Sequence, residues 1–323
     1  MAIESPSPPH PNPLPLGRGS EPCSRQGRMP FTLAHLSDPH LAPLPTPRLG
    51  ELMNKRLTGY LNWLRKRRFV HERAVLDRIV ADLKAQSSDH IAVTGDIANL
   101  ALPEEFARSR AWLESLGSPQ NVSLVPGNHD AYVAGGLEQA ARQWRPYMAD
   151  DDGTMRFPYL RRRGTLALIG LSTAVPTAPF MATGRLGSAQ LAALAQMLEA
   201  LKREPLFRVV LIHHPPVSQA ARHKRLTDAE GLLRVIAAQG AELLLHGHDH
   251  RAMLNWLAGP DGARVPSVGV PSASATPGMS KDAAGYNLYR IDGKPGAWRC
   301  EMIARGIDAD GETTERQRLM LLN

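Results

Sequence analysis

The chain has 323 residues, of which 43% are hydrophobic and 21% charged, and its formal net charge is +7. This composition is ordinary for a folded globular protein. The sequence contains no run of about 18 apolar residues, the length that a membrane-spanning helix needs, so we expect no membrane span. Two cysteines, Cys23 and Cys300, are too few for a disulfide framework, and no secretory signal precedes the first strand-like run, so we expect a cytoplasmic protein. The positive charge favours anionic partners such as phosphate esters, nucleic acid or acidic lipid, and it fits a role in solubility alone equally well.

Residues 1–28 differ in composition from the rest of the chain. Seven prolines fall between Pro6 and Pro22, among serines and glycines. Such a segment buries too little apolar surface to offset its ordering entropy, so we predict a disordered tail before one domain at 29–323. Met29 stands directly before the first strand-like run, so a true start at Met29 is a second hypothesis. Mass spectrometry of the native N-terminus would test it.

From residue 31 onward, strand-like and helix-like segments alternate. Strands are predicted at 31–37, 90–94, 121–125, 159–171 (a hairpin), 207–212 and 242–245. Four further strands, expected to be antiparallel, are predicted at 252–257, 264–270, 285–291 and 298–303. Helices are predicted at 49–67, 71–85, 103–116, 137–148, 188–203 and 228–239. This order predicts an α/β domain with two central sheets flanked by helices.

Short polar clusters follow five of these predicted strands. They are Asp38-Pro39-His40, Gly95-Asp96, Gly127-Asn128-His129-Asp130, His213-His214-Pro215 and His246-Gly247-His248-Asp249-His250. Ligands of α/β sheets bind beyond the carboxyl ends of strands, where such loops converge. Each cluster alone has a plainer explanation as a surface loop, a turn or a packed histidine pair. Five in succession, each at a strand end, favour a functional site.

The residue types are those that bind divalent cations. Carboxylate and amide oxygens with neutral imidazoles suit manganese, iron or zinc, and no thiolate takes part. The seven to nine ligand candidates are too many for one ion. Two ions about 3.5–4 Å apart that share a carboxylate would use them all. We therefore predict two divalent metal ions as cofactors.

In type and order, these motifs resemble those of the calcineurin-like metallophosphoesterases, and within them the bacterial phosphodiesterase-like branch. The resemblance covers about residues 31–255 and implies a four-layer α-β-β-α sandwich with two central mixed sheets. By motif position, it implies that Asp38, His40, Asp96 and His250 hold one metal, with Asp96 bridging. It assigns Asn128, His213 and His248 to the second metal. Spacing leaves open whether His214 replaces His213, and whether His246 and His248 replace the later pair.

The same resemblance places two catalytic residues beside the ligands. His129 follows a metal ligand without being one, so it could protonate the leaving oxygen or hold the phosphate. Asp130 could orient the ring of His129. Two cations bound to one water would give a hydroxide at neutral pH, which attacks phosphorus in line with the departing alkoxide. The implied activity is phosphoester hydrolysis, and a phosphodiester is the expected substrate.

A basic segment between the first two motifs allows other substrates. Within 49–69, six cations are interleaved with three aromatic residues: Lys55, Arg56, Arg65, Lys66, Arg67 and Arg68, with Tyr60, Trp63 and Phe69. Such a helix can lie on an anionic membrane, or it can pack its apolar stripe on the domain with a solvated basic face. The membrane interpretation would make the protein peripheral at the inner membrane face. It would suit a lipid-linked substrate, as in the family's UDP-diacylglucosamine pyrophosphatases.

Two further interpretations assign the protein a different kind of function. A nuclease would suit the positive charge, but no appended nucleic-acid module or dense aromatic–basic platform is present, so we do not expect nucleic acid as the partner. A catalytically silent binding scaffold would have lost metal ligands, whereas every ligand position is filled here. The sequence does not identify the metal or the oligomeric state.

Overall fold

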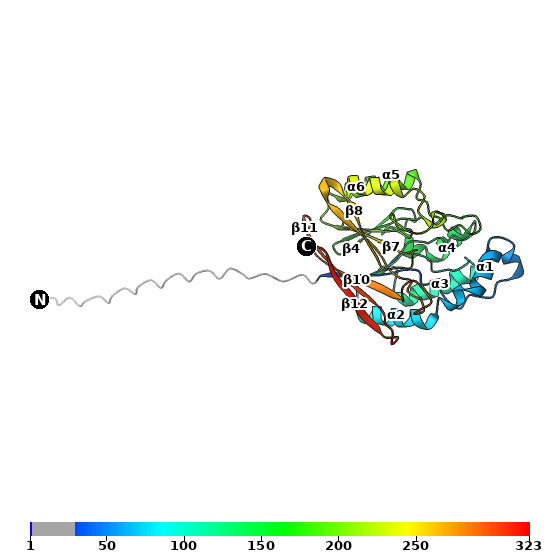
Figure 1. Ribbon diagram of the computed structural model, residues 1–323. Helices are drawn as coiled ribbons and strands as arrows, with labels where there is room; N and C mark the ends of the chain where they lie inside the picture. Colours follow the sequence, from blue (N-terminus) through cyan, green and yellow to red (C-terminus); the bar gives the residue numbers. More distant parts are fainter. Residues whose placement is uncertain (2–29) are drawn as a thin grey trace.

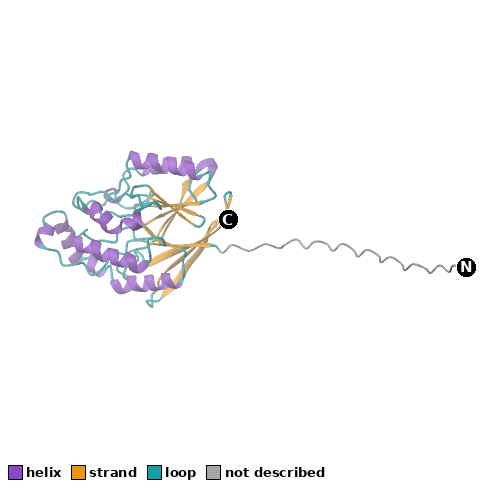
Figure 2. Cartoon of the chain, turned by 180° about the vertical axis from the view of Figure 1, so that it is seen from behind, coloured by secondary structure: helices purple, strands orange, loops and turns teal. Residues whose placement is uncertain are grey.

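The computed structural model describes residues 30–323 and Met1, so the expectation for the Pro-rich segment falls outside the described residues. Two sheets of six strands lie face to face, with helices on both outer sides (Figure 1). Helices α5 (Ser188–Leu201) and α6 (Ala229–Gln239) cover one outer face. The other side carries α2 (Arg73–Ala85) and α3 (Pro103–Leu116), and α4 (Gly136–Met148) packs against α3 and β3. Figure 2 shows the same helix–sheet–sheet–helix order from behind, which confirms the expected four-layer arrangement.

The first sheet combines two parallel strand pairings with three antiparallel ones. Its strands are β1 (Phe31–Leu36), β2 (His90–Val93), β3 (Val122–Leu124), β10 (Gly285–Lys294), β11 (Ala297–Ile307) and β12 (Thr313–Leu322). They lie in the order β12-β11-β10-β1-β2-β3. Because β1, β2 and β3 run parallel, the loops that follow them emerge at the same edge.

The second sheet has a parallel centre and antiparallel edges. Its strands are β4 (Tyr159–Arg163), β5 (Leu166–Gly170), β6 (Phe207–Leu211), β7 (Leu243–His246), β8 (Met253–Ala258) and β9 (Arg264–Gly269). They lie in the order β4-β5-β6-β7-β9-β8, with β5, β6, β7 and β9 parallel to one another. The antiparallel expectation is confirmed for β8 with β9 and for β10 with β11. It does not cover the other side of β9, which pairs parallel to β7.

Alternation along the strands explains the layering. On β5, Leu166 and Leu168 join the core shared with the first sheet, whereas Ala167 and Ile169 pack under α5 and α6. All four are fully buried, as expected for a strand covered on both faces. Strand β12 lacks such a pattern, since most of its residues are exposed, and local sequence patterns do not predict it.

The predicted helix at 49–67 is broken into three pieces. They are η1 (Leu49–Leu52), α1 (Arg56–Arg65) and η2 (Arg67–Phe69). The side chain of Asn54 accepts a hydrogen bond from the backbone N–H of Arg56, 2.8 Å away, which favours a new start at that point. Tyr60 and Trp63 stack on each other and pack on Leu44, Leu100 and Leu102. The remaining short helices are η3 (Arg222–Lys224) and η4 (Pro260–Gly262). Among the described residues, every helix is too short or too polar to span a bilayer.

Candidate metal centre

The polar clusters meet where parallel strands of both sheets end. Asp38 and His40 follow β1, Asp96 follows β2 and Asn128 follows β3. On the opposing sheet, His213 follows β6, and the segment from His248 to His250 follows β7. The site therefore lies between the carboxyl edges of the two sheets, and neither sheet could build it alone.

Unusual backbone conformations are concentrated in these loops. Positive φ angles occur at Asp38 (52°), His40 (35°), Asp96 (54°), His248 (69°) and His250 (52°). Non-glycine residues seldom adopt this region, and each costs of order 1–3 kcal/mol unless its surroundings hold it there. The fold thus maintains local strain that aims these side chains at one point.

The first group of side chains forms a tight cluster. Nε2 of His250 lies 3.1 Å from Oδ1 of Asp38 and 3.3 Å from Nε2 of His40. Nε2 of His40 is also 3.8 Å from Oδ2 of Asp96. The carbonyl oxygen of Ala98 lies 3.3 Å from Nδ1 of His40, where it can accept a hydrogen bond from that N–H, and this tautomer leaves the Nε2 lone pair for the cluster.

The second group shares the carboxylate of Asp96. Nε2 of His213 lies 3.4 Å from Oδ2 of Asp96 and 3.2 Å from Oδ1 of Asn128. Nδ1 of His248 lies 3.3 Å from the same His213 nitrogen. The other nitrogen of each ring faces a backbone carbonyl oxygen. Thr94 O is 2.6 Å from His213 Nδ1, and Lys224 O is 2.7 Å from His248 Nε2. All seven expected ligands therefore lie in one connected cluster with Asp96 at its centre.

The two alternative histidines make other contacts, and a ring nitrogen of His214 also lies within 4.8 Å of those of His213 and His248. His214 bonds Oγ1 of Thr173 through Nδ1, at 2.7 Å, and the carbonyl of Ala182 through Nε2, at 3.1 Å. His246 ends β7 and packs on Gly269, where an added Cβ would lie 2.5 Å from its ring. The geometry therefore favours His213 and the pair of His248 and His250 as the ligands.

His129 and Asp130 contact different partners from those expected. Nδ1 of His129 lies 2.6 Å from the carbonyl oxygen of Asn99, which fixes its ring. The carboxylate of Asp130 instead accepts backbone N–H groups of Asp96, Ala98 and Gly127, at 2.8–2.9 Å. The expectation that Asp130 orients the ring of His129 is not what the contacts show. Asp130 ties together the loops that carry Asp96 and Asn128.

The charges of the buried groups favour a cation at this point. Burial opposes protonation of His213, but the nearby carboxylates of Asp96 and Asp38 outweigh it and raise the His213 pKa to about 10. Burial alone would raise the pKa of Asp38, yet His250 and its hydrogen bond hold that pKa below its usual value. Burial raises the pKa of Asp130 to about 7, with repulsion from Asp96 adding to it.

These residues fit a pair of divalent cations. The carboxylates of Asp38 and Asp96 are buried. Among the described residues, their only ion-pair partners within 4 Å are histidines. Burial and neighbouring positive charge hold the pKa values of His40 and His248 well below normal, so both rings are in the neutral form that binds metal. Carboxylate oxygen, amide oxygen and imidazole nitrogen make a suitable donor set.

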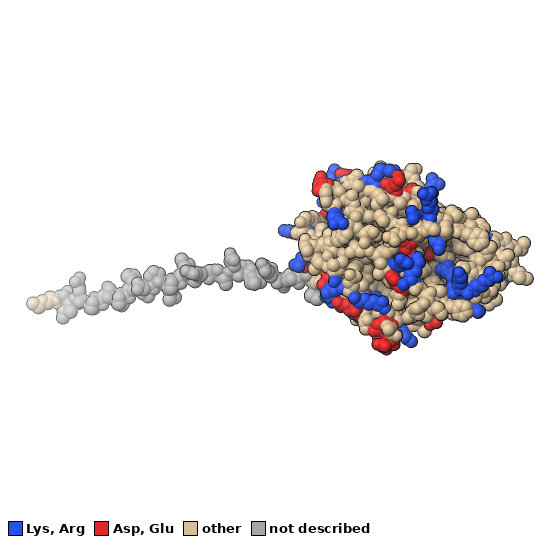
Figure 3. Space-filling view, viewed as in Figure 1, with Lys and Arg blue, Asp and Glu red and all other residues tan. Residues whose placement is uncertain are grey.

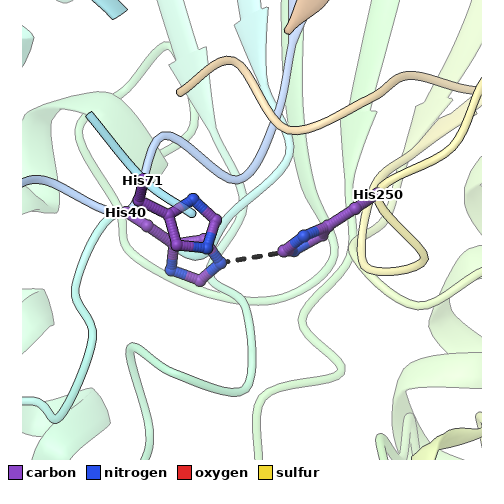
Figure 4. A group of neighbouring side chains, drawn as sticks. All are labelled: His40, His71 and His250. Carbon is purple, nitrogen blue, oxygen red and sulfur yellow. Dashed lines mark hydrogen bonds between the residues drawn. The ribbon is translucent and has the colours of Figure 1, made fainter. Parts of the chain in front are cut away.

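Sequence reasoning missed two side chains of the site, His71 and Arg67. The ring centroids of His71 and His40 are 4.4 Å apart, and Figure 4 shows both rings near His250. Nη1 of Arg67 lies 2.6 Å from Nε2 of His129. His71 belongs to none of the five clusters, and Arg67 is one of six cations in a basic segment. No spacing signal distinguishes either residue from its neighbours.

A large open cavity gives access to the cluster. Its volume is about 750 Å³, within the range of small-molecule sites. Asp96, Asn128, His129, His248 and His250 line its floor. Its wall and mouth include a set of cations and apolar side chains, namely Lys55, Lys66, Arg67, Lys224, Lys281, Phe180, Met181 and Met279. The site is therefore reachable by a ligand larger than a phosphate ion.

Comparison with known proteins agrees with this geometry. A Synechococcus protein described as a probable cyclic nucleotide phosphodiesterase is 27% identical over 236 residues, which are 72% of this chain and 82% of that protein. The glycerophosphodiester phosphodiesterase GpdQ of Enterobacter lignolyticus is 28% identical over 187 residues, 57% of each chain.

Solved structures show the same fold. A dimetal phosphatase from Danio rerio superposes with a TM-score of 0.59 at 14% identity, covering 91% of this chain and 99% of its own. A purple acid phosphatase from yellow lupin superposes with a TM-score of 0.51 at 13% identity, and the match covers 90% of this chain and 53% of the phosphatase chain. The sequence profile of the calcineurin-like phosphoesterases matches residues 31–252. This chain belongs to the calcineurin-like phosphoesterase family.

Proposed function

We propose that this protein hydrolyses phosphodiesters at a site that holds two divalent metal ions. The observation that carries the proposal is the convergence of Asp38, His40, Asp96 and His250 with Asn128, His213 and His248 around one cavity. The two sequence relatives support a diester substrate, since both are described as phosphodiesterases. A cavity of about 750 Å³ has room for both arms of a diester.

The ligand assignment follows the two halves of the cluster. Asp38, His40 and His250 would hold one ion, Asn128, His213 and His248 the other, and Asp96 would contact both. When bound, such a pair supplies a hydrolytic nucleophile at neutral pH and offsets the charge of the phosphate oxygens. Manganese, iron and zinc all accept this donor set.

His129 is placed to act on the substrate itself. With Nδ1 facing the carbonyl of Asn99, its Nε2 lies beside Nη1 of Arg67, and both residues line the cavity. As the new bond to phosphorus forms and the bond to the leaving alkoxide breaks, the leaving oxygen needs a proton. We assign to His129 the transfer to the leaving oxygen, through Nε2, of the proton that the attacking water releases. Asp130 acts as a positioning residue, because its carboxylate holds the backbone of Asp96 and Gly127.

A substrate screen after manganese reconstitution tests the activity. The substrates are bis-p-nitrophenyl phosphate, p-nitrophenyl phosphate, cyclic AMP and UDP-diacylglucosamine. We expect the diester to be cleaved faster than the monoester, and Asp96→Ala to abolish turnover. His223→Ala is the matched control, because that ring is exposed and outside the cluster. Faster monoester cleavage would make the protein a monoesterase, and no turnover on any substrate would overturn the proposal.

A lipid-linked substrate is a second candidate, favoured by exposed apolar side chains beside the cavity. Leu49 and Met53 are 88% and 86% exposed, and Leu57 and Leu61 continue their spacing of four along α1. Phe180, at the cavity mouth, is 83% exposed. Large exposed apolar patches on soluble proteins mark interaction sites.

Charge beside this patch suits an anionic lipid surface. Arg65, Lys66 and Arg68 are exposed where α1 ends. Figure 3 shows Lys and Arg atoms gathered near α1, next to an uncharged tip of the molecule. Lys55 and Arg56 do not belong to this basic surface, because Lys55 bonds Thr177 and Arg56 bonds the carbonyl of Leu100.

Vesicle flotation separates the two candidates. We expect wild-type protein to float with vesicles containing anionic lipid and Leu57→Gln/Leu61→Gln to float much less. Met320→Gln is the control, since Met320 is a similarly exposed apolar residue on β12. Equal flotation of all three proteins, or none, would remove the lipid candidate and leave a freely diffusing diester.

A further inference from the structure

Arg67 reaches the candidate metal centre from outside the five polar clusters. It begins η2, between the loop that carries His40 and helix α2. Its Nη1 lies 2.6 Å from Nε2 and 3.1 Å from Nδ1 of His129, and its Nη2 lies 2.9 Å from Nε2 and 3.2 Å from Nδ1 of His40. Each of these two guanidinium nitrogens lies against both nitrogens of one ring. Its neighbours Lys66 and Arg68 are exposed, whereas Arg67 is partly buried and lines the cavity. One guanidinium therefore spans a metal-ligand candidate and the histidine proposed to handle the leaving group.

The contact with His40 competes with metal binding. Nδ1 of His40 faces the carbonyl of Ala98, so Nε2 offers the one remaining lone pair. A cation bound at that lone pair would lie beside the positive charge of Nη2, which is within 3.2 Å of both ring nitrogens of His40. When a cation binds His40, the two positive charges repel, and Nη2 of Arg67 needs an acceptor elsewhere. A guanidinium donates five N–H groups and accepts none, and buried donors need partners.

The scissile phosphate supplies suitable acceptors in the same space. A phosphodiester carries a negative charge on its two non-bridging oxygens. The planar fork of arginine matches such oxygens better than an ammonium group does. Arg67 lies next to His129, so oxygens held by its guanidinium would sit beside the imidazole proposed to act at the leaving oxygen.

We propose that Arg67 is a substrate-binding residue that holds the non-bridging oxygens of the scissile phosphate once metal occupies His40. The proposal rests on the proposed phosphoester hydrolysis. It assigns to the segment between the first two motifs a part in substrate recognition. It also explains why Arg67 faces the cavity while its neighbours Arg65, Lys66 and Arg68 are exposed.

The test compares Arg67→Gln and Arg67→Lys with Arg68→Gln. The last variant loses the same charge one residue away, at a side chain outside the cavity lining. Titration calorimetry measures the binding of inorganic phosphate to the manganese-loaded protein. We expect Arg67→Gln to weaken phosphate binding about 10- to 100-fold, as for loss of a charged hydrogen bond. Arg67→Lys should recover part of the affinity, and Arg68→Gln should match wild type.

Manganese affinity, measured by titration of the metal-free proteins, provides a second readout. Arg67→Gln should bind manganese at least as tightly as wild type, because it no longer competes for His40. Unchanged phosphate affinity in Arg67→Gln would overturn the proposal. Reduced manganese affinity would also overturn it, because Arg67 would then serve to build the metal site.

Steady-state kinetics on bis-p-nitrophenyl phosphate separates this proposal from the proposed function. For Arg67→Gln, we expect KM to rise, with metal content unchanged. If wild type binds phosphate through Arg67 but cleaves no phosphoester, the hydrolase assignment fails and the contact stands. If wild type turns over and Arg67→Gln equals it in KM and phosphate affinity, the contact fails and the hydrolase assignment stands.

Discussion

Nε2 of His40 lies 3.3 Å from Nε2 of His250, although 210 residues separate them in the chain (Figure 4). Two imidazole lone pairs repel at this distance unless a proton or a cation lies between them. Oδ1 of Asp38 is 3.1 Å from the same His250 nitrogen, so the space between the rings is also electronegative. These contacts join a loop of the first sheet to a loop of the second, and a bound cation would strengthen that connection.

Metal binding should therefore stabilise the folded protein. A ligand that binds only the folded state at 100 times its Kd adds about 2.7 kcal/mol, which for a chain of this size is a shift in Tm of roughly 5 °C. We expect manganese to raise the Tm of wild type by this order and a chelator to reverse it. His250→Ala should lose most of the shift, and His223→Ala should keep it. Scanning calorimetry with and without manganese measures the effect, and an equal shift in both variants would contradict the assignment of His250.

The leaving group should determine how much the His129→Ala substitution lowers kcat. Loss of a general acid typically slows a reaction about 100- to 10,000-fold when the leaving group is a poor one. An alkyl leaving group needs a proton, whereas p-nitrophenolate leaves readily without one. We therefore expect a large fall in kcat for an alkyl diester and a much smaller one for bis-p-nitrophenyl phosphate. Bound manganese, measured by elemental analysis, should be unchanged. Equal losses on both substrates would mean that His129 holds the phosphate instead.

Gly247 should be intolerant of a side chain because of its contact with the first motif. An added Cβ would collide with Oγ of Ser37 and Oδ2 of Asp38. Overpacking of this kind typically costs about 1–3 kcal/mol, and here it also displaces a metal ligand. We expect Gly247→Ala to lose manganese affinity and turnover. Gly50→Ala is the control, since no atom lies within 4 Å of its added Cβ. Wild-type metal affinity in Gly247→Ala would show that Asp38 is not a ligand.

His90 should make the protein sensitive to mild acid. It is buried in β2, where its Nε2 bonds Oγ of Ser123 at 2.9 Å. Burial, with smaller effects from Arg163 and Arg161, lowers its pKa to about 3. Because the folded pKa lies below the unfolded value of 6.5, the unfolded state binds more protons between these values. The contribution of neutral His90 is complete above pH 6.5 and declines as the pH falls toward 3.

At pH 5, this single group should reduce the free energy of unfolding by about 2 kcal/mol relative to pH 7.5. His90→Gln cannot take up a proton and keeps a nitrogen near the Nε2 position. We expect this variant to lose about 2 kcal/mol less than wild type between the two pH values. Urea unfolding at pH 7.5 and pH 5 measures both differences. Parallel losses in the two proteins would show that His90 is protonated without penalty in the fold.

Much of the architecture could be predicted from local patterns. The helix at 103–116 has the same bounds in the structure, because Pro103 occupies its first turn and its apolar residues recur with helical spacing. The hairpin of β4 and β5 was predicted from Gly164 between two strand-like runs. β12 could not be predicted, because an exposed strand needs no apolar alternation. The parallel pairing of β7 with β9 was missed for another reason: β8 lies between them in sequence, and partner choice depends on contacts across the sheet.

The sequence by itself determined the chemistry of the site. The five polar clusters could be found because each follows a strand. Their resemblance to the family's motifs then named seven ligands: Asp38, His40, Asp96, Asn128, His213, His248 and His250. Only the tertiary structure decided which histidine faces Asp96, because neighbouring residues such as His213 and His214 point in different directions once their strand is packed. It also decided the positions of Arg67 and His71, since contacts between distant segments depend on how the layers pack and leave no local pattern in the sequence.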